Sequence, residues 1–310
     1  MSSQTIAQTA PAPADYTMNA RLWAQLVLLG MIWGGSFFFA SVAVKEIPPL
    51  VLVLLRVGIA ALALHLYLLA RGPSFAAAVP YALSFVGLGL LNNIIPFSLM
   101  FAGQTAIGAG LASVLNATTP VWTLILAGYV FRSEAPGWNK LAGVVLGVAG
   151  VAMMIGPGLA AGLGGPVWAK FALLGTALSY GFAGIYAKRF SKLPPIVVAA
   201  GQLTAATLIM VPVVAVAGGF GAVFQASATT WGAVLGIALL ASAFAYIIFF
   251  NLIANAGASN ASLVTLIVPV SAILLGALFL GEHLEPFEIG GMALIGLGLV
   301  AIDGRLLRRR

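Results

Sequence analysis

The sequence contains no cysteine. Disulfides, thiolate nucleophiles, iron–sulfur clusters and cysteine-ligated zinc are therefore excluded. Charged residues are also scarce, at 7% of 310 residues, whereas a soluble domain carries roughly a quarter. Hydrophobic residues make up 62% of the chain, and the mean hydropathy is +1.10. This composition excludes a soluble domain and predicts an all-α polytopic membrane protein.

Ten apolar segments are long enough to cross a bilayer as helices, because a helix needs about 20 apolar residues to do so. They are Leu22–Val44, Pro49–Ala70, Val79–Phe101, Thr105–Val130, Trp138–Ile155, Val167–Lys188, Pro195–Ala217, Trp231–Asn255, Ser259–Leu280 and Phe287–Asp303. Residues 1–21 are rich in Ala, Pro and Thr and predict a disordered cytoplasmic tail. Residues 305–310 predict a basic cytoplasmic tail that anchors to anionic lipid and does not bind nucleic acid.

The basic residues indicate the orientation of these segments. If the N-terminus is cytoplasmic, the outer side holds only Lys45 and Lys170, and Arg56 lies within a helix. The cytoplasmic side then holds Arg21, Arg71, Arg132, Lys140, Lys188, Arg189, Lys192, Arg305, Arg308, Arg309 and Arg310. Such a bias follows the positive-inside rule. We therefore expect a multi-pass membrane protein with both termini in the cytoplasm.

The second half of the chain repeats the first. KEIPPLVLVLLR (residues 45–56) aligns with SKLPPIVVAAGQ (residues 191–202), and the offset between equivalent positions drifts only from 146 to 149 residues. The repeats cover residues 22–157 and 166–304, with five predicted helices each. An odd number of spans turns the second repeat upside down relative to the first. Inverted repeats are typical of secondary transporters, which bind substrate near the midplane at the repeat interface.

Several short motifs are similar to a known family. They are WGGSF (residues 33–37), the paired prolines before the second predicted helix, the proline in the fourth, and Gly281-Glu282 before a glycine-spaced final helix. In this order the chain resembles the drug/metabolite transporter superfamily, in its EamA-type branch of two tandem five-helix modules. Ser133 departs from the pattern, since it replaces the glycine before Glu134. The resemblance implies a location in the bacterial inner membrane and export of amino acids and other small metabolites. The aromatic and Asn content favours the aromatic amino-acid exporters.

The repeat also selects candidate substrate-binding residues, because equivalent positions should line one central cavity from opposite sides. Four pairs match an aromatic with an aromatic or a polar with a polar side chain: Trp33/Tyr180, Asn93/Ser242, Phe97/Tyr246 and Asn116/Thr265. Such a cavity suits a small amphipathic or zwitterionic solute. The alternative is structural, since Trp and Tyr also anchor at interfaces and Asn, Ser and Thr join helices. Of the neighbours Asn92 and Asn93, we expect Asn93 to line the cavity and Asn92 to bond a neighbouring helix.

Three prolines are candidate hinge positions within the membrane. Pro120 follows a polar cluster in NATTPVW (residues 116–122), and Pro269 follows the equivalent stretch TLIVPVS (residues 265–271). Helices can unwind at such points and offer backbone groups to substrate. Helical spacing places Thr119 on the face of Asn116, so Thr119 joins the candidate lining. Pro96 frees a carbonyl in the preceding turn, which either binds substrate or simply kinks the helix.

Arg56 is the only basic residue well inside a predicted span. It lies about 10 Å from the outer helix end at 1.5 Å per residue. It either attracts a substrate carboxylate or extends outward and braces its helix. Its repeat partner is Gln202, so the repeat supports a polar position there without requiring a charge.

The acidic residues are few and lie in the tail, in loops or at helix ends: Asp15, Glu46, Glu134, Glu282, Glu285, Glu288 and Asp303. Proton- or sodium-driven carriers usually keep a carboxylate in the membrane, so facilitated transport without a coupling ion is favoured. Backbone carbonyls leave ion coupling open. No enzyme motif, metal-ligand spacing or cofactor motif is present, so we expect neither catalysis nor a cofactor. The alternatives are proton-coupled export of other metabolites or drugs and, more remotely, a channel. A monomer is compatible with this plan.

Overall fold

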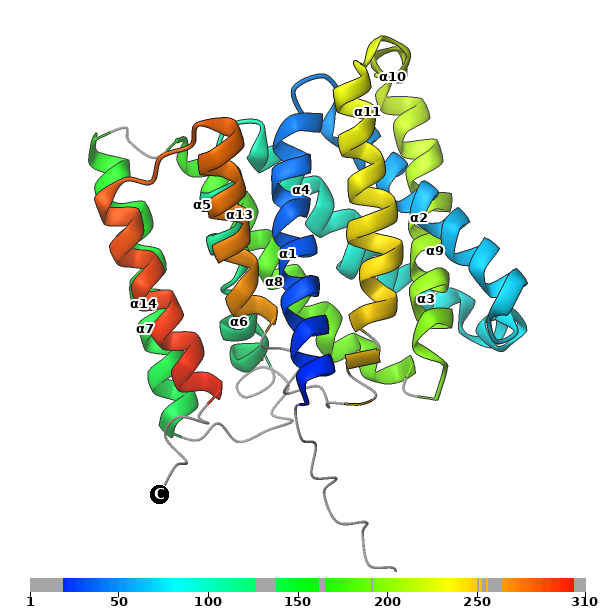
Figure 1. Ribbon diagram of the computed structural model, residues 1–310, viewed down its shortest axis with the longest axis horizontal. Coiled ribbons are helices and arrows are strands. Elements are labelled where there is room, and N and C mark those ends of the chain that lie inside the picture. Colours follow the sequence, from blue (N-terminus) through cyan, green and yellow to red (C-terminus); the bar gives the residue numbers. More distant parts are fainter. Residues whose placement is uncertain are drawn as a thin grey trace, which may run out of the picture.

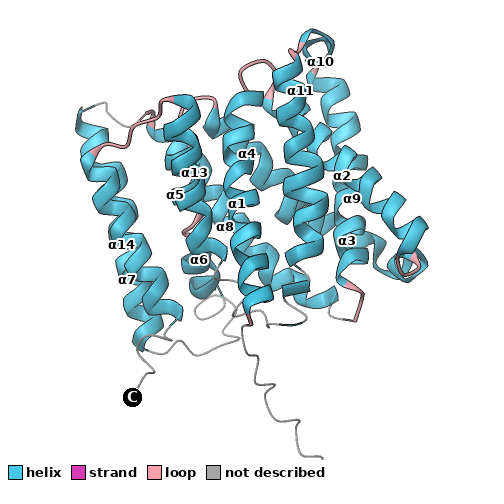
Figure 2. Ribbon diagram, in the orientation of Figure 1, coloured by secondary structure: helices cyan, strands magenta, loops and turns pink. Residues whose placement is uncertain are grey.

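The structure is a computed structural model that describes residues 19–126, 138–161, 165–190, 192–249, 251–252, 255 and 264–303. These residues form helices and connecting turns without any strand (Figure 2). Within them, five helical stretches are long and apolar enough to cross a membrane: Ala20–Ala43, Pro49–Arg71, Phe75–Gln104, Pro195–Ala217 and Ala228–Phe249. The predicted all-α membrane fold is confirmed.

The described helices of the first repeat begin and end close to the predicted segments. At the start of α1, the Asn19 side chain accepts a hydrogen bond from Leu22 N at 2.9 Å. Helix α2 starts at Pro49, because a proline at the first helical position loses no hydrogen bond. The elements are α1 (Ala20–Ala43), α2 (Pro49–Arg71), η1 (Phe75–Tyr81), α3 (Ala82–Gly89), η2 (Leu90–Ile94), α4 (Ile95–Gln104), α5 (Ala109–Asn116), α6 (Thr119–Ile125) and α7 (Trp138–Ala161).

The second repeat has the same order of elements. Its helices are α8 (Val167–Tyr186), η4 (Ala187–Phe190), α9 (Pro195–Ala217), α10 (Gly221–Gln225), α11 (Ala228–Leu235), η5 (Gly236–Phe244), α13 (Val264–Leu280) and α14 (Pro286–Asp303). Gly218 and Gly281, which follow α9 and α13, have positive φ angles of 77° and 65°. Glycine adopts this conformation without the steric cost that a side chain would add.

The helix packing shows that the two repeats are related by a pseudo-two-fold axis. Equivalent helices pack against each other, α2 against α9 and α7 against α14. Other contacts occur in matched pairs: α1 packs on α13 as α8 packs on α5 and α6, and η2 packs on α8 as η5 packs on α1. Figure 1 shows α7 and α14 as a pair at one side of the bundle, with the other helices gathered beside them. The predicted duplicated arrangement is confirmed.

Both repeats carry a π-helical segment at the equivalent position. It spans Leu90–Ile94 in η2 and Gly236–Phe244 in η5, and the predicted pair Asn93/Ser242 lies within these segments. A π-helical turn widens the helix locally and leaves backbone groups without regular partners, which is why such turns occur frequently at functional sites. The hydroxyls of Thr176 and Ser179 on α8 donate to two carbonyls in this region, those of Pro96 and Leu91.

The segment predicted as one helix over Thr105–Val130 differs in the structure. Helix α5 begins only at Ala109, and its regular α-helical pattern is interrupted at Ala117 and Thr118 before α6 starts at Thr119, although both residues keep right-handed helical backbone angles. Pro120 lies at the start of α6, where its missing N–H costs least. Thr118 Oγ1 donates to the Leu115 carbonyl at 2.7 Å, and Thr118 N donates to the same carbonyl at 3.2 Å, so the Thr118 hydroxyl makes a local bond that competes with the regular helical pattern.

The ends of the bundle define two faces. We call the end that holds Ala20 and Asp303 the terminal face, and the other end the opposite face (Figure 1). The opposite face carries the connections 44–48, 105–108, 218–227 and 281–285. Both described ends of the chain therefore lie on one side of the bundle, as an even number of crossings requires.

A carboxylate on the opposite face joins the two repeats. Glu46, between α1 and α2, accepts hydrogen bonds from Ser227 N at 2.7 Å and Ser227 Oγ at 2.9 Å. These bonds favour the ionised carboxylate and hold the pKa of Glu46 below its ordinary value of 4.5. A lowered folded-state pKa contributes stability above the unfolded-state pKa, and that stability is lost as the pH falls through the folded-state pKa.

We therefore expect the wild type to melt at a higher temperature than Glu46→Gln at pH 7. The difference should shrink as the pH falls below about 4.5, where protonation makes the two side chains alike. Thermal unfolding in detergent at pH values from 3 to 7 measures this difference. A difference that stays constant over the whole range would show that the Glu46 charge does not contribute.

Candidate functional site

Arg56 is the centre of a buried polar and aromatic cluster. Its side chain is only 6% exposed. Its Nε donates to Ser242 Oγ at 3.1 Å, and its guanidinium lies over the Phe97 ring, with Cζ 3.7 Å from the ring centroid. Tyr180 and Tyr246 interact electrostatically with the same guanidinium. Elements of both repeats, namely α2, α4, α8 and the η5 region, thus supply the groups around one cation.

Gln202 on α9 has matching surroundings, related to those of Arg56 by the repeat. Gln202 Oε1 accepts from Asn92 Nδ2 at 2.8 Å, and both side chains hydrogen-bond Tyr246. Arg56 therefore contacts the aromatic Phe97 of its own repeat and a polar residue in η5. Gln202 contacts the aromatic Tyr246 of its own repeat and a polar residue in η2. We call these residues, with Phe101 and Tyr180, the Arg56 cluster.

Among the described residues, no carboxylate balances the charge of Arg56. No carboxylate is recorded against it in the described part of the chain, and its Nη1 is buried without a hydrogen-bond partner. Removing a cation from water costs several kcal/mol unless hydrogen bonds and a counter-charge compensate. The cation–π contact with Phe97 supplies about 2 kcal/mol in a desolvated setting. The arrangement is therefore prepared to accept an anionic group such as a carboxylate.

The structure places the remaining predicted substrate residues at different points. Trp33 on α1 packs against Phe249, with 5.2 Å between ring centroids, whereas its repeat partner Tyr180 belongs to the Arg56 cluster. Asn93 is fully buried, and neither its Oδ1 nor its Nδ2 has a partner. The expectation that Asn92 bonds a neighbouring helix agrees with its bond to Gln202. Contact of these side chains with substrate stays a prediction.

The stretch around the break between α5 and α6 is held mainly by its own hydroxyls. Thr119 Oγ1 donates to the Asn116 carbonyl at 2.7 Å, and Trp122 Nε1 donates to Thr118 Oγ1 at 3.2 Å. Asn116 Oδ1 is buried without a partner. The side chain of its repeat partner Thr265 lies outside the described residues. The proposed pairing of these two positions across a cavity therefore stays a prediction.

The three prolines occupy different backbone settings. Pro120 follows the interruption after α5, and Pro96 lies in the first turn of α4, directly after the π-helical segment. The carbonyl of Leu91, near the point where Pro96 disturbs the helix, accepts from Ser179 Oγ at 2.7 Å. Pro269 lies inside α13, which continues past it to Leu280. The repeats are therefore not equivalent at Pro120 and Pro269.

Two members of the Arg56 cluster were not among the predicted residues. Phe101 lies with its ring centroid 5.8 Å from Arg56 Cζ. Its spacing of four residues from Phe97 places both rings on one helix face, which is a usable sequence signal. Asn92 was not predicted to line the cavity, because the equivalent residue of the second repeat is Ala241. Pairing equivalent positions misses Asn92, because Gln202 bonds Asn92 whereas Arg56 bonds Ser242, which is equivalent to the neighbouring Asn93.

The described part of the chain has no group of three His, Asp or Glu side chains placed to hold a metal ion. The fold is a membrane bundle of two inverted repeats, and the Arg56 cluster is a charged and aromatic site where the repeats meet. This combination defines a multi-pass membrane transporter.

Comparison with known proteins identifies the family. Two matches to the EamA-like transporter family cover residues 21–156 and 167–302, so the chain belongs to this family of transporters, which are not enzymes. It is 26% identical over 286 residues to the uncharacterized inner membrane transporter YedA of Escherichia coli K12, covering 91% of this chain and 90% of that protein. It is 27% identical over 297 residues to a probable terminal-alkyne amino-acid exporter of Streptantibioticus cattleyicolor, covering 94% and 96%.

A solved crystal structure shares the fold. It aligns with a TM-score of 0.64 and 20% sequence identity, and the match covers 94% of this chain and 99% of that chain. At this identity the likeness concerns the arrangement of helices alone.

Proposed function

We propose that the protein exports neutral amino acids, with a preference for large apolar or aromatic side chains, across the bacterial inner membrane. Transport proceeds by alternating access around the interface between the repeats, with both termini in the cytoplasm. The observation that carries the proposal is the buried Arg56 guanidinium, whose Nη1 lacks a partner. The similarity to a probable amino-acid exporter and to an inner membrane transporter supports the substrate class and the location.

Each part of an amino acid has a counterpart in the Arg56 cluster. The carboxylate binds the guanidinium, because paired N–H donors match the two carboxylate oxygens. The ammonium group meets the carbonyl and hydroxyl oxygens of Gln202 and Tyr246. The side chain packs on the rings of Phe97, Phe101 and Tyr180. A site built from one cation, amides and aromatic rings favours a zwitterion with an apolar side chain over a cationic drug, which would need a carboxylate.

Transport in liposomes tests this proposal with three matched solutes. We expect labelled phenylalanine to enter liposomes that contain the protein at least about tenfold faster than empty liposomes. Unlabelled 3-phenylpropionate should compete weakly, because it keeps the carboxylate but lacks the ammonium group. Phenylethylamine should not compete, because it lacks the carboxylate that Arg56 binds; one charge-assisted bond lost is worth about tenfold or more in affinity.

Two further arms distinguish the alternatives. Preloading with unlabelled phenylalanine should accelerate uptake, because exchange requires a carrier, whereas a channel would not respond. A pH gradient should leave the rate unchanged if no proton is coupled. If phenylethylamine is transported and phenylalanine is not, the substrate is a cationic amine and the proposal is wrong.

A further inference from the structure

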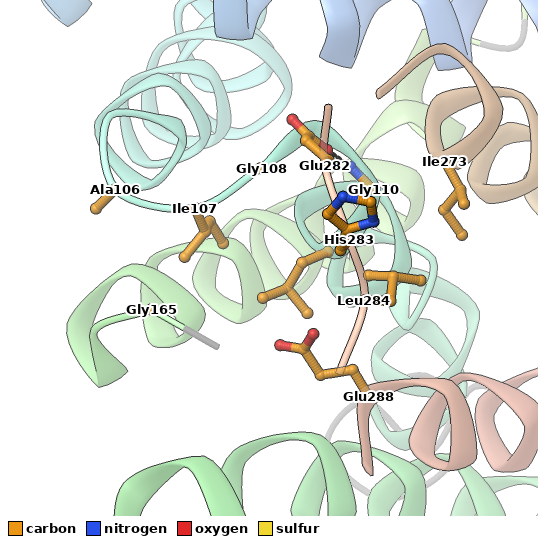
Figure 3. Close-up of a pocket in the computed structure, with 11 residues that line it drawn as sticks. Ala106, Ile107, Gly108, Gly110, Gly165, Ile273, Glu282, His283, Leu284 and Glu288 are labelled. Carbon is orange, nitrogen blue, oxygen red and sulfur yellow. Dashed lines mark hydrogen bonds between the residues drawn. The ribbon is translucent and has the colours of Figure 1, made fainter. Parts of the chain in front are cut away.

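A pocket lies on the opposite face, away from the Arg56 cluster. Its volume is about 190 Å³, and no residue of the Arg56 cluster lines it. It is bounded by the turn between α4 and α5, the start of α5, Gly165 before α8, and the connection between α13 and α14 (Figure 3). The pocket is therefore formed where helices end, at the depth of the lipid headgroups.

Both carboxylate oxygens of Glu282, one of the two glutamates in the pocket, already accept hydrogen bonds. Glu282 Oε1 accepts from Ala109 N at 2.8 Å, and Oε2 accepts from Gly110 N at 3.0 Å. These bonds fasten the 281–285 connection to the start of α5, where free backbone N–H groups favour an anion. A Cβ at Gly108 would lie 2.6 Å from the Glu282 carboxylate, so glycine is required for this approach. Glu282 thus forms part of the wall.

The other glutamate, Glu288, has an oxygen without a donor. The side chain is 2% exposed and lines the pocket. Its Oε2 accepts from Glu285 N at 2.9 Å, whereas Oε1 is buried and has no hydrogen-bond partner. In Figure 3 the Glu288 carboxylate points from the start of α14 towards the pocket and Leu284. Lys170 interacts with Glu288 electrostatically, but no donor reaches Oε1.

A buried carboxylate oxygen without a donor is costly, so the group that completes the site must carry N–H or O–H donors. A metal ion is disfavoured, because Ca²⁺ or Mg²⁺ needs six or more oxygen ligands and the described residues bring no three acids or histidines together. A primary ammonium has three donors and a positive charge. The volume equals that of about six water molecules, enough for an aminoethyl group beside the apolar Ile107 and Leu284.

We propose that this pocket binds a primary ammonium group, held by Glu288 Oε1. Two sources present the same chemistry at this depth, namely the headgroup of an aminophospholipid and a small soluble amine. Bound ammonium would tie α14 to the start of α5 through the 281–285 connection, and would thereby stabilise the packing of these segments on the opposite face. The inference does not depend on the identity of the transported solute.

Thermal unfolding tests the site in nanodiscs. Wild-type protein in phosphatidylethanolamine is compared with the same protein in phosphatidylcholine, whose quaternary ammonium has no N–H donor. In phosphatidylcholine, ethanolamine is then titrated against choline as its matched control. We expect a higher melting temperature with phosphatidylethanolamine, with ethanolamine, or with both. In Glu288→Gln the lipid difference should vanish and the half-saturating ethanolamine concentration should rise roughly tenfold, as the loss of a charge-assisted bond predicts.

Two further variants keep the test decisive. Glu285→Gln removes a neighbouring charge whose side chain does not line the pocket, so it should respond as the wild type does. Leu284→Trp fills the pocket with every charge intact and should abolish the response, which covers the case that Glu288→Gln fails to fold. A response to the lipid identifies the headgroup as ligand, and a response to ethanolamine alone identifies a soluble amine. If the wild type responds to neither, or if Glu288→Gln or Leu284→Trp responds as the wild type does, the inference is wrong.

Discussion

Arg56→Met is expected to lower amino-acid uptake by about 100-fold while leaving the protein at least as heat-stable as the wild type. Uptake falls because the substrate carboxylate loses its charged partner in a desolvated site, a loss of about 2–5 kcal/mol. Stability holds because Arg56 is buried with Nη1 unpaired and with no carboxylate of the described segments against it. Replacing a buried charge by an apolar side chain of similar length is often neutral or stabilising.

The measurement pairs initial uptake rates in liposomes with melting temperatures in detergent. Arg71→Met is the matched control, since Arg71 is an exposed residue at the end of the same helix, α2; it should change neither quantity appreciably. Arg56→Lys should restore little transport, because an ammonium cannot reproduce the planar pair of donors. If Arg56→Met transports normally or unfolds at a much lower temperature, then Arg56 is a structural residue.

Gly34→Ala is expected to prevent α1 from packing on α13. A Cβ at Gly34 would overlap Ser271 Oγ and would lie 2.8 Å from the Val268 carbonyl oxygen and 2.9 Å from Ala272 N. Two of these three atoms are backbone, so no side-chain rotation relieves the overlap and the helices must separate. Overpacking of a close interface costs about 3 kcal/mol or more. The folded yield and the melting temperature of the purified protein should both fall sharply.

The adjacent glycine supplies a control in the same motif. A Cβ at Gly35 would meet Leu275 and Phe39 at 3.8 Å, which is ordinary van der Waals contact. Gly35→Ala should therefore fold and transport as the wild type does. Adding Ser271→Ala to Gly34→Ala removes the overlap with the hydroxyl but not with the backbone, so it should rescue stability only in part. A stable, monodisperse Gly34→Ala protein would contradict the packing observed between the two helices.

Much of the fold follows from composition and internal repetition. Long apolar segments must become helices in a bilayer, because every backbone group needs an internal partner there. The alignment of Pro48-Pro49 with Pro194-Pro195 predicted the start of equivalent helices, and α2 and α9 begin there and pack side by side. The interruption at Ala117–Thr118 lies just before Pro120, a candidate hinge, but its form was not predicted, since an apolar run with one proline is equally compatible with a continuous kinked helix.

The site was predictable only in part. Pairing equivalent positions selected Phe97, Tyr246 and Ser242, which do lie around Arg56 or Gln202, because a pseudo-two-fold axis brings equivalent residues towards the same centre. The same pairing joined Trp33 to Tyr180, yet Trp33 packs on Phe249. Whether any of these residues contacts substrate stays a prediction. Sequence position also placed Glu288 simply at a helix end, whereas its burial beside a pocket depends on three other segments.

The amino-acid sequence by itself determined the membrane class, the helical fold and the inverted repeat, since these depend on hydrophobicity, length and repetition along the chain. It also determined that Arg56 is a cation at membrane depth. That this cation lies on Phe97 and beside Ser242, with no carboxylate from the described part of the chain against it, follows only from the packing of the helices. Likewise, the tertiary structure alone showed that the close approach of α1 and α13 requires a glycine at position 34 but not at position 35. These are distances between segments far apart in the chain, and the packing of the whole bundle sets them.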